Sequence, residues 1–345
     1  MLKIIGYAVL LGLSCSLAFA QTHFEIWHRK DKTPATEDIY RYIYYSVSEQ
    51  NLLLQLKNMT GYNNVTVGSQ TFAVSNRYDS AAKTNFRTYW TGYFNGLGIQ
   101  VKELSYPTHW TNIESQGHNL EAVLPGKSSD SVVIIVHYDS MGSAGHETEN
   151  PAVDDDMTGM AVSLETARVL SQYKDRLKYT VRFVAADFEE WDDDKAGIAL
   201  EGARQYAQYL LKLSQSQHFK IIGAIDNEQI GWSGAASTPA GLTFDVAICS
   251  GDDKKFNYPQ LGLKMEKVVK KYSHLHVNEA CYSDVSDHYA MWEIGVPSLM
   301  YIEHNPWLND HFDQNGGDIL EKIDLDYFYQ IARVGVTFAA KMAGL

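Results

Sequence analysis

The stretch VVIIVHYDS, residues 132–140, decides the fold expected for this chain. Its first five residues are all β-branched and predict a strand that is buried on both faces, because a half-exposed strand would alternate apolar and polar residues. Polar residues follow at once, from His137 to Ser140. In a sheet covered by helices, ligands bind beyond the carboxyl ends of the strands. The stretch therefore predicts a central strand that delivers polar side chains to a site.

Short apolar runs and helical segments alternate along the rest of the chain from about residue 119. Earlier segments rich in aromatic residues predict two helices, the second of them capped by Asp79. This pattern predicts an α/β fold, a three-layer sandwich with a central mixed, mostly parallel sheet flanked by helices. The expected helices are 36–59, 80–97, 157–170 and 325–342, and the expected strands are 132–136, 180–185, 221–225 and 297–302.

The first 20 residues have the order of a cleavable signal peptide: Lys3, an apolar run over 4–17, and Ala18-Phe19-Ala20. The apolar run is shorter than the roughly 20 residues that a membrane-spanning helix needs. A lipoprotein modified at Cys15 is the weaker alternative, because no large aliphatic residue lies three positions earlier. We expect a secreted or periplasmic protein that begins at Gln21. The remaining residues, 21–345, predict a single domain whose part from about 33 to 100 is helical.

The chain is acidic, with a formal net charge of −13, which becomes −14 when Lys3 is removed with the signal peptide. Such a charge disfavours nucleic acid and anionic membranes as partners. No later apolar stretch is long enough to span a bilayer, so we expect no stable membrane insertion and a monomer. Cys249 and Cys281 remain after processing. In an exported protein this pair fits either one disulfide or two buried thiols.

His137 and Asp139 follow the first strand directly and are two residues apart. A metal-bound imidazole usually has its second nitrogen held by a carboxylate, and Asp139 is placed to hold it. A strand-end histidine beside an acid is more often structural, so this pair alone is weak evidence for a metal.

Three aspartates, Asp154, Asp155 and Asp156, precede the helix expected at 157–170. One of them would cap the helix, and all would benefit from its dipole. Three adjacent carboxylates repel one another unless a cation neutralises them. The run therefore indicates a divalent metal, and this interpretation outweighs that of a simple helix cap.

Glu189 and Glu190 follow the strand expected at 180–185. Adjacent carboxylates at a strand end can divide their roles, one binding metal and the other transferring protons. Plain surface acidity is the alternative, since the acidic run 192–194 lies close behind. In a substrate pocket, that run would favour a lysine or arginine side chain.

Further acids and histidines follow the later strands. Asp226 and Glu228 share one face at the end of the strand at 221–225, and either would serve as a ligand. Asp287 with His288, and Asp310 with His311, flank the strand at 297–302. Each group alone has a structural explanation, but five strand ends that all carry His, Asp or Glu make a shared site the better interpretation. The sequence has no Gly-x-Ser-x-Gly elbow, phosphate-binding glycine loop, Cys-x-x-Cys pair or His-Glu-x-x-His helix.

The order of these motifs resembles the M28 family of zinc aminopeptidases: His-x-Asp-Ser, Asp-Asp-Asp-x-Thr-Gly, Glu-Glu, a strand-end acid before Ile-Gly, Ser-Asp-His and a last His. The segment 117–126 also looks like that family's approach to the first metal strand, and the resemblance covers nearly the whole mature chain. It implies a compact single-domain enzyme without a protease-associated insert. It further implies two zinc ions and peptide substrates with a free amino terminus.

The resemblance also assigns roles to residues of this chain. Glu189 is the general base that serves a water shared by the two ions, and Asp155 bridges them. Asp154 and Asp156 shape the turn and cap the helix, while Asp139, Asp226 and Asp287 support the ligands. The implied metal ligands are His137, Asp155, Glu190, Glu228 and His311.

Two positions depart from the family pattern. Glu228 fits the register before Ile230-Gly231, although the family usually has Asp there, and Asp226 is the alternative. His311 lacks the family's preceding aromatic residue and an aspartate four residues later, and His304 is the alternative.

Two other functions compete with aminopeptidase activity. A glutaminyl-peptide cyclase shares this architecture and the His-Tyr-Asp-Ser motif, but looks to use one zinc ion. A non-catalytic binding protein of the same fold would have lost some of these ligands or the base, whereas every position is filled here.

Overall fold

The computed structural model describes residues 38–345 apart from 143–145, 191–198, 240, 252–254, 283 and 312–316. The expected signal peptide and the start at Gln21 lie outside the described residues, and they stay predictions together with secretion and the monomeric state. Within the described ranges, no helix is long and apolar enough to cross a membrane. Residues 38–345 belong to one compact unit.

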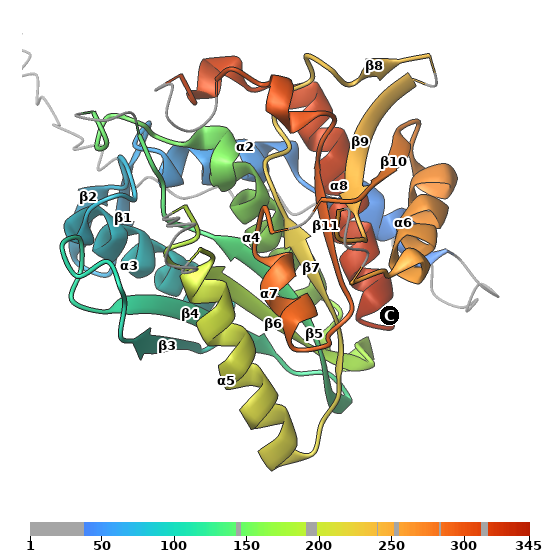
Figure 1. Ribbon diagram of the computed structural model, residues 1–345, viewed down its shortest axis with the longest axis horizontal. Coiled ribbons are helices and arrows are strands. Elements are labelled where there is room, and N and C mark those ends of the chain that lie inside the picture. Colours follow the sequence, from blue (N-terminus) through green and yellow to red (C-terminus); the bar gives the residue numbers. More distant parts are fainter. Residues whose placement is uncertain are drawn as a thin grey trace, which may run out of the picture. The chain divides into compact units, whose positions relative to one another are not determined.

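Strand β5 (Ser128–His137) occupies the middle of a nine-stranded sheet, as its unbroken apolar run predicts. It pairs in parallel with β6 (Tyr179–Ala186) on one side and with β7 (Ile221–Asn227) on the other. Strand β11 (Ser298–Glu303) continues the parallel part beyond β7. The carboxyl ends of these four strands therefore lie at the same edge of the sheet (Figure 1).

Antiparallel pairing flanks this parallel centre. On one side β4 (Gly117–Leu124) pairs with β6, and β3 (Val101–Tyr106) forms the edge. On the other side β9 (Gly241–Ala247) runs antiparallel to β11 and parallel to the edge strand β10 (His276–Ala280). The predicted mixed α/β sheet is confirmed, and its central strands supply the parallel part.

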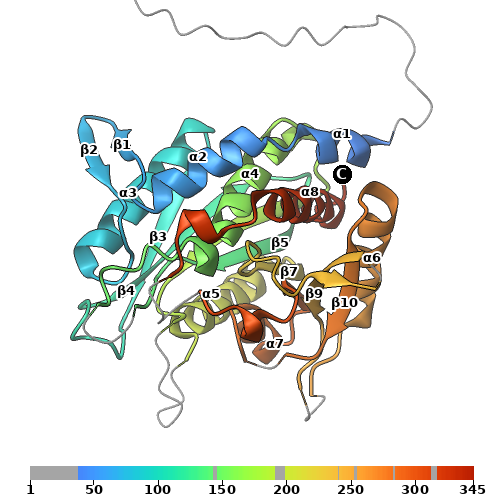
Figure 2. The same ribbon diagram turned by 90° about the horizontal axis from the view of Figure 1, so that it is seen from above.

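The side chains of β5 alternate between two apolar layers. Val132, Ile134 and Val136 pack toward α4 and α8, whereas Val133 and Ile135 pack toward α5 and α7. All five are at most 1 % exposed, and burying one such side chain stabilises the fold by roughly 1.5–3 kcal/mol. Figure 2 shows the resulting three layers, with α4 and α8 on one side of the sheet and α5 and α7 on the other.

The helices follow the sequence prediction with one difference. The helix expected over 36–59 is two helices, α1 (Ile39–Ser46) and α2 (Glu49–Met59). Ser48 is extended between them, and its hydroxyl accepts a hydrogen bond from the Asn51 backbone N–H, which starts a new helix. The predicted cap at Asp79 is confirmed, because its carboxylate accepts the Ala82 N–H at the start of α3 (Ser80–Gly96).

The remaining elements connect or cover these layers. They are β1 (Asn64–Val67), β2 (Gln70–Ala73), the π-helical turn η1 (Val153–Thr158), α4 (Gly159–Ser171), η2 (Lys174–Arg176), α5 (Glu201–Gln217), β8 (Ser237–Thr238), α6 (Pro259–Tyr272), α7 (His288–Glu293), η3 (Pro306–Leu308), η5 (Leu320–Lys322) and α8 (Leu325–Met342).

Candidate metal centre and active site

His137 is the last residue of β5 and is 1 % exposed. Its Nε2 lies 3.0 Å from Asp155 Oδ1, and its Nδ1 lies 3.8 Å from Asp139 Oδ1. Asp139 also accepts the backbone N–H groups of Glu189 at 3.0 Å and Glu190 at 3.1 Å. One buried carboxylate thus ties the end of β5 to the Glu-Glu pair that follows β6.

The three adjacent aspartates have separate surroundings in η1, and the peptide bond between Asp155 and Asp156 is cis. Asp154 Oδ1 accepts the Gly231 N–H at 2.6 Å, and Asp156 Oδ1 accepts the Gly159 N–H at the first residue of α4. Asp155 has His137 as its side-chain partner. These contacts agree with the prediction that the outer two aspartates shape the turn and the start of the helix.

Asp318 and Glu303 are buried acids that the sequence analysis did not place at the site. The Asp318 carboxylate accepts the backbone N–H groups of Asp154 at 2.6 Å and Asp155 at 2.9 Å. Glu303 accepts the Asn309 side-chain amide, which also reaches Asp154 Oδ2 at 3.3 Å. Glu303 ends a strand and so carried a local signal, whereas nothing near Asp318 in the sequence points to η1.

Arg77 is a third residue near the site that the sequence did not indicate. Its guanidinium is fully buried and donates to the backbone carbonyls of Met59, Tyr138, Pro151 and Ala152. The Tyr138 carbonyl belongs to the segment that carries His137, and those of Pro151 and Ala152 belong to the segment that leads to Asp155. Arg77 therefore holds these two segments together and places a cation near the acidic cluster.

Two groups of ligand atoms each lie within 4.8 Å of one another among the described residues, and both contain His137. One group adds Asp155 and Glu190, and the other adds Asp156 and Glu228. Imidazole nitrogen and carboxylate oxygen are the donors that zinc accepts in proteins. Among the residues that the structure describes, the buried His137 Nδ1 and Asp156 Oδ2 have no hydrogen-bond partner. Burying such polar atoms without a partner costs folding free energy unless a cation binds them. The residues present therefore fit a metal.

The acidity of the cluster supports the same conclusion. Burial raises the pKa of Asp155 above its usual range, and the Glu228 carboxylate raises it further. Burial also raises the pKa of Asp156 and of Asp287 well above the usual range. A bound cation would remove this cost, because it favours the ionised carboxylates.

Glu189 is half-buried and lines a cavity beside this cluster. Burial raises the pKa of Glu189 well above its usual range, with smaller contributions in the same direction from Glu228 and Asp287. A carboxylate with a raised pKa can take and return a proton near neutral pH. Glu189 therefore has the position and the acidity expected of a general base.

Glu228 and Asp226 have different partners at the end of β7. Glu228 Oε1 lies 3.7 Å from His137 Nε2, and its Oε2 accepts the Ser286 hydroxyl. Asp226 accepts the backbone N–H of His288 at 2.9 Å and lies 3.2 Å from its Nδ1. The geometry favours Glu228 as the ligand and Asp226 as a support for the start of α7.

Asp287 is fully buried, and neither of its carboxylate oxygens has a hydrogen-bond partner within the described part of the chain. It follows Ser286, whose hydroxyl contacts Glu228. Asp287 is thus the neighbour of a residue that contacts the cluster, and its supporting role stays a prediction.

The structure places the two late histidines apart. His304 Nδ1 lies 2.5 Å from the buried Asp245 carboxylate, outside both groups of metal-ligand atoms. The His311 side chain is 31 % exposed, and its Nδ1 lies 3.1 Å from Asp310. His311 is also outside these groups, so its role as a ligand stays a prediction.

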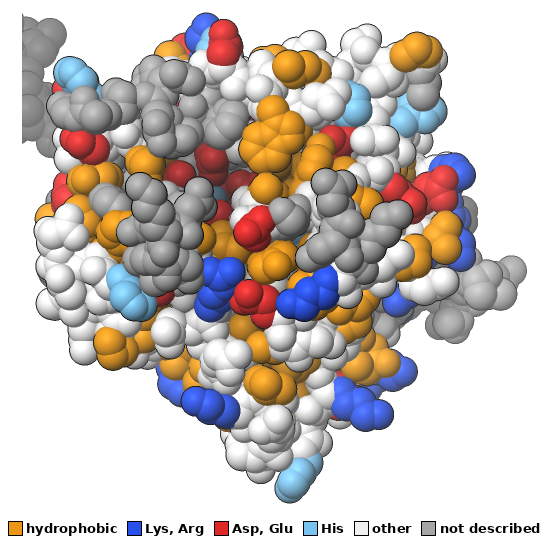
Figure 3. All heavy atoms as spheres, in the orientation of Figure 1, with side chains coloured by type: hydrophobic (Ala, Val, Ile, Leu, Met, Phe, Trp, Pro, Cys, Tyr) orange, Lys and Arg blue, Asp and Glu red, His pale blue; other side chains and the backbone are white. Residues whose placement is uncertain are grey.

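A cavity of about 330 Å³ opens beside the cluster and is partly apolar. Asp155, Glu189, Glu190 and Glu228 line its floor. Figure 3 shows acidic side chains within a hollow of this face, with hydrophobic side chains nearby. The walls are formed by Ala199, Leu200, Gln229, Asp284, Val285, Ile302, Pro306 and Trp307.

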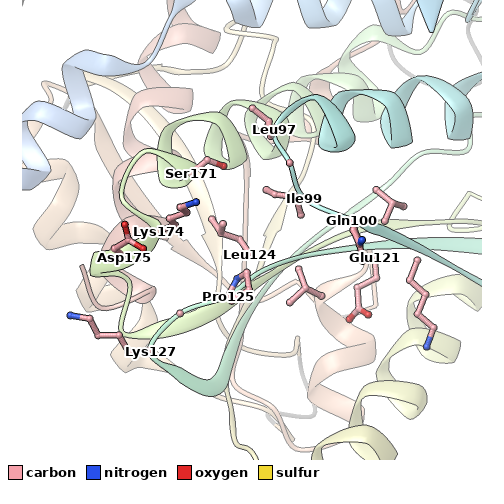
Figure 4. A pocket seen from close by; sticks show the side chains of 15 residues that line it. Leu97, Ile99, Gln100, Glu121, Leu124, Pro125, Lys127, Ser171, Lys174 and Asp175 are labelled. Atoms are coloured by element: carbon pink, nitrogen blue, oxygen red, sulfur yellow. The ribbon is translucent and has the colours of Figure 1, made fainter. Parts of the chain in front are cut away.

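A larger cavity of about 940 Å³ lies at the other end of the sheet, near the start of β5 (Figure 4). Leu97, Ile99 and Leu124 form its apolar lining, and Lys127 and Lys174 lie at its rim. It contains none of the acids of the cluster, so its size does not make it the candidate active site.

A sequence-family model matches more than half of this chain. The model described as peptidase family M28 matches residues 119–339, which include every residue assigned above to the metal centre. The chain belongs to peptidase family M28. The family resemblance inferred from the sequence motifs is thereby confirmed.

Curated relatives in family M28 include leucine aminopeptidases of fungi. Leucine aminopeptidase 1 of Metarhizium robertsii is 23 % identical over 252 residues, which cover 72 % of this chain and 59 % of the relative. The enzyme of the same name from Neurospora crassa is 25 % identical over 228 residues, which cover 66 % of this chain and 54 % of the relative. The M28 chain described here thus spans between a half and three fifths of the length of these relatives.

Solved structures share the fold at low sequence identity. The aminopeptidase LapA of Legionella pneumophila has a TM-score of 0.65 and 18 % identity, with 90 % of this chain and 75 % of that chain covered. A leucine aminopeptidase precursor of Bacteroides thetaiotaomicron has a TM-score of 0.66, 14 % identity and coverage of 84 % and 96 %. A glutaminyl cyclase of Porphyromonas gingivalis has a TM-score of 0.64, 16 % identity and coverage of 86 % and 97 %. These likenesses establish the M28 fold.

Proposed function

We propose that this M28 chain is a zinc-dependent aminopeptidase that removes the first residue of peptides with a free amino terminus. The observation that carries the proposal is the convergence of His137, Asp155, Glu190 and Glu228 beside a cavity that Glu189 also lines. The names of the fungal relatives and of the Legionella structure support the same activity.

The ligands proposed for two zinc ions are the five that the family resemblance implies. Bound zinc would supply Lewis acidity and lower the pKa of a coordinated water toward neutrality. Asp155 is the proposed bridge, and Asp139 orients His137. The complete proposed set is His137, Asp155, Glu190, Glu228 and His311.

Glu189 is the proposed general base. Its backbone N–H is held by Asp139 Oδ1, which fixes the start of its side chain next to the cavity. Its carboxylate accepts a proton from the attacking water and delivers it to the amine that leaves. The carboxylates of Glu228 and Asp284 at the cavity attract the cationic amino terminus of the substrate, which favours cleavage at the chain end.

The cavity walls bear on the preferred first residue. Leu200, Val285, Ile302 and Trp307 present apolar surface, and a volume of about 330 Å³ suits a single side chain. We therefore propose a preference for an apolar first residue. The acidic run 192–194, which suggested lysine or arginine, lies outside the described residues.

The test uses Glu189→Gln, which keeps the size of the side chain and removes the base. We expect zinc content to stay at the wild-type level and turnover of leucyl-p-nitroanilide to fall by about 10²- to 10⁴-fold. The matched control is Glu266→Gln, an exposed residue of α6 whose partner is Lys270. A Glu189→Gln enzyme with near-normal turnover would remove the proposed base.

The alternative function, cyclisation of amino-terminal glutamine, is tested on the same purified protein. Assays with leucyl, phenylalanyl, lysyl and glutaminyl peptides, with chelation and zinc restoration, separate hydrolysis from ring formation. We expect hydrolysis of the apolar substrates and about two zinc ions per chain. One zinc ion per chain together with cyclisation of glutaminyl peptides would reverse the assignment.

A further inference from the structure

Asp245 is a buried acid of β9 that the proposed reaction does not use. Its carboxylate meets four donors from three segments of the chain. Oδ1 lies 3.0 Å from Asn278 Nδ2 and 2.5 Å from His304 Nδ1. Oδ2 accepts the Tyr282 hydroxyl and, at 3.3 Å, the Asn305 backbone N–H. An ionised carboxylate only accepts hydrogen bonds, so His304 must donate through Nδ1.

Three of these donors, Tyr282, His304 and Asn305, lie in the two loops that form one wall of the active-site cavity. Tyr282 comes shortly before Asp284 and Val285, which line the cavity. Asn305 comes directly before Pro306 and Trp307, which line it as well. The rings of Tyr282 and Trp307 are also in contact, with centroids 6.0 Å apart and planes at 79°. A single carboxylate therefore fixes both loops and the contact between them.

A disulfide strengthens the first of these loops. Cys249, just after β9, is bonded to Cys281, the residue before Tyr282. Of the two states that the sequence allowed for these cysteines, one disulfide or two buried thiols, the structure has the disulfide. It holds the base of the loop close to β9, so that Tyr282 needs little additional ordering to reach Asp245.

Trp307 is the part of this wall that most needs support. Its side chain is 61 % exposed although it lines the cavity. An exposed indole is poorly fixed by packing, so its position depends on the segment that carries it. On its amino-terminal side that segment is anchored by His304 and Asn305, which both contact Asp245. On its carboxyl-terminal side the Asn309 amide donates to Glu303.

We propose that Asp245 is a positioning residue that fixes the Trp307 wall, the part of the cavity lining formed by Asp284, Val285, Pro306 and Trp307. In this way Asp245 sets the affinity for the first residue of the substrate. The inference rests on the proposed function in that it names peptides as the substrate. Asp245 and His304 act through the wall, since neither belongs to the two groups of metal-ligand atoms. Their removal should change substrate binding while the metal centre stays intact.

The first experiment is independent of activity and measures amide hydrogen exchange in Asp245→Asn. The amide side chain keeps the shape, but its NH₂ group cannot accept the hydrogen bonds now made by one oxygen. We expect exchange in 284–287 and 304–309 to accelerate at least about tenfold, while the metal-ligand segment 153–160 keeps wild-type rates. Unchanged exchange in both loops would overturn the proposal.

Two further variants make this experiment selective. Tyr282→Phe removes one hydrogen bond and keeps the ring, so it should produce a smaller acceleration in the same loops even if Asp245→Asn folds poorly. Asp130→Asn is the control, because Asp130 accepts the Lys220 N–H near the start of β5. It should leave both loops at wild-type rates, and an equal acceleration in this control would also overturn the proposal.

The second experiment is a double-mutant cycle with leucyl-p-nitroanilide. Asp245→Asn should raise KM about tenfold, with kcat within about twofold and unchanged zinc content. In a Trp307→Ala background the same substitution should raise KM less than about twofold, because the residue it positions is gone. Fully additive effects would refute positioning through Trp307. A wild-type enzyme without hydrolase activity would refute the proposed function and leave hydrogen exchange as the test of Asp245.

Discussion

His137 ends the strand β5, His304 directly follows the strand β11, and both lie beside an aspartate, yet their surroundings differ. His137 has carboxylate oxygens of Asp155 and Glu228 within 3.7 Å of its Nε2. His304 has Asp245, whose two oxygens are occupied by other donors as well. Around His137, carboxylate oxygens that accept hydrogen bonds outnumber the groups that donate them. Around His304, both oxygens of the Asp245 carboxylate already accept hydrogen bonds from donors. The comparison teaches that an unbalanced excess of carboxylates distinguishes a metal centre from a structural histidine.

The largest expected effect comes from removing the histidine on the metal side of this comparison. His137→Ala deletes a donor that both groups of metal-ligand atoms share. We expect zinc content to fall below one ion per chain and turnover to drop by more than about 10⁴-fold, because zinc supplies the activated water. Zinc analysis and turnover at saturating substrate check this result. Full zinc content in the variant would show that His137 is structural.

A smaller effect is expected from Asp139→Asn, which changes the partner of His137 and leaves the ligands themselves. Asp139 lies 3.8 Å from His137 Nδ1 and holds the backbone of Glu189 and Glu190. Loss of such a supporting carboxylate should weaken zinc binding by about 10- to 100-fold. Competition with a fluorescent zinc chelator measures this change. Wild-type affinity would mean that backbone geometry alone orients the imidazole.

The excess of carboxylates should also appear as a pH dependence of the metal-free protein. Burial raises the pKa of Asp154 from 3.8 to about 6 and that of Asp318 well above its usual range. The folded state therefore binds more protons than the unfolded state, and the free energy of unfolding falls as the pH rises through this window. For Asp154 alone the loss between about pH 5 and about pH 8 is roughly 1.5 kcal/mol.

Urea unfolding of the metal-free protein at about pH 5 and about pH 8 measures this loss. We expect a lower midpoint at the higher pH, and a much smaller difference after zinc is restored. A metal-free midpoint that is equal or higher at the higher pH would contradict the idea that the cluster carries uncompensated negative charge.

The smallest effect on metal is expected at the other histidine. His304→Ala breaks the contact with Asp245 and leaves every predicted ligand in place. Zinc affinity should stay within about twofold of the wild type, although KM rises through the Trp307 wall. Isothermal titration with zinc checks this outcome. A tenfold loss of zinc affinity would place His304 among the ligands instead of His311.

The sequence predicted the frame of the molecule in considerable detail. The run 132–136 is a central buried strand, Asp79 caps its helix, and the last helix spans 325–342 as expected. Such features depend on residues close together in the chain, since strands need β-branched runs and helix starts need short polar caps. The break between α1 and α2 was missed because the Ser48 cap is too weak a signal within an apolar segment.

The sequence by itself also determined which strand ends carry acids and histidines, and the family pattern ordered them. Only the tertiary structure decided which of them meet. Asp318 binds the backbone of η1 although it lies 163 residues from Asp155 in the sequence. Arg77 joins the segments of His137 and Asp155 by donating to the backbone carbonyls of Tyr138 and Ala152. Asp245 gathers two loops around a cavity, and Cys249 bonds to Cys281. These pairings depend on how the sheet orders its strands, because buried polar groups find partners that are near in space regardless of their separation in sequence.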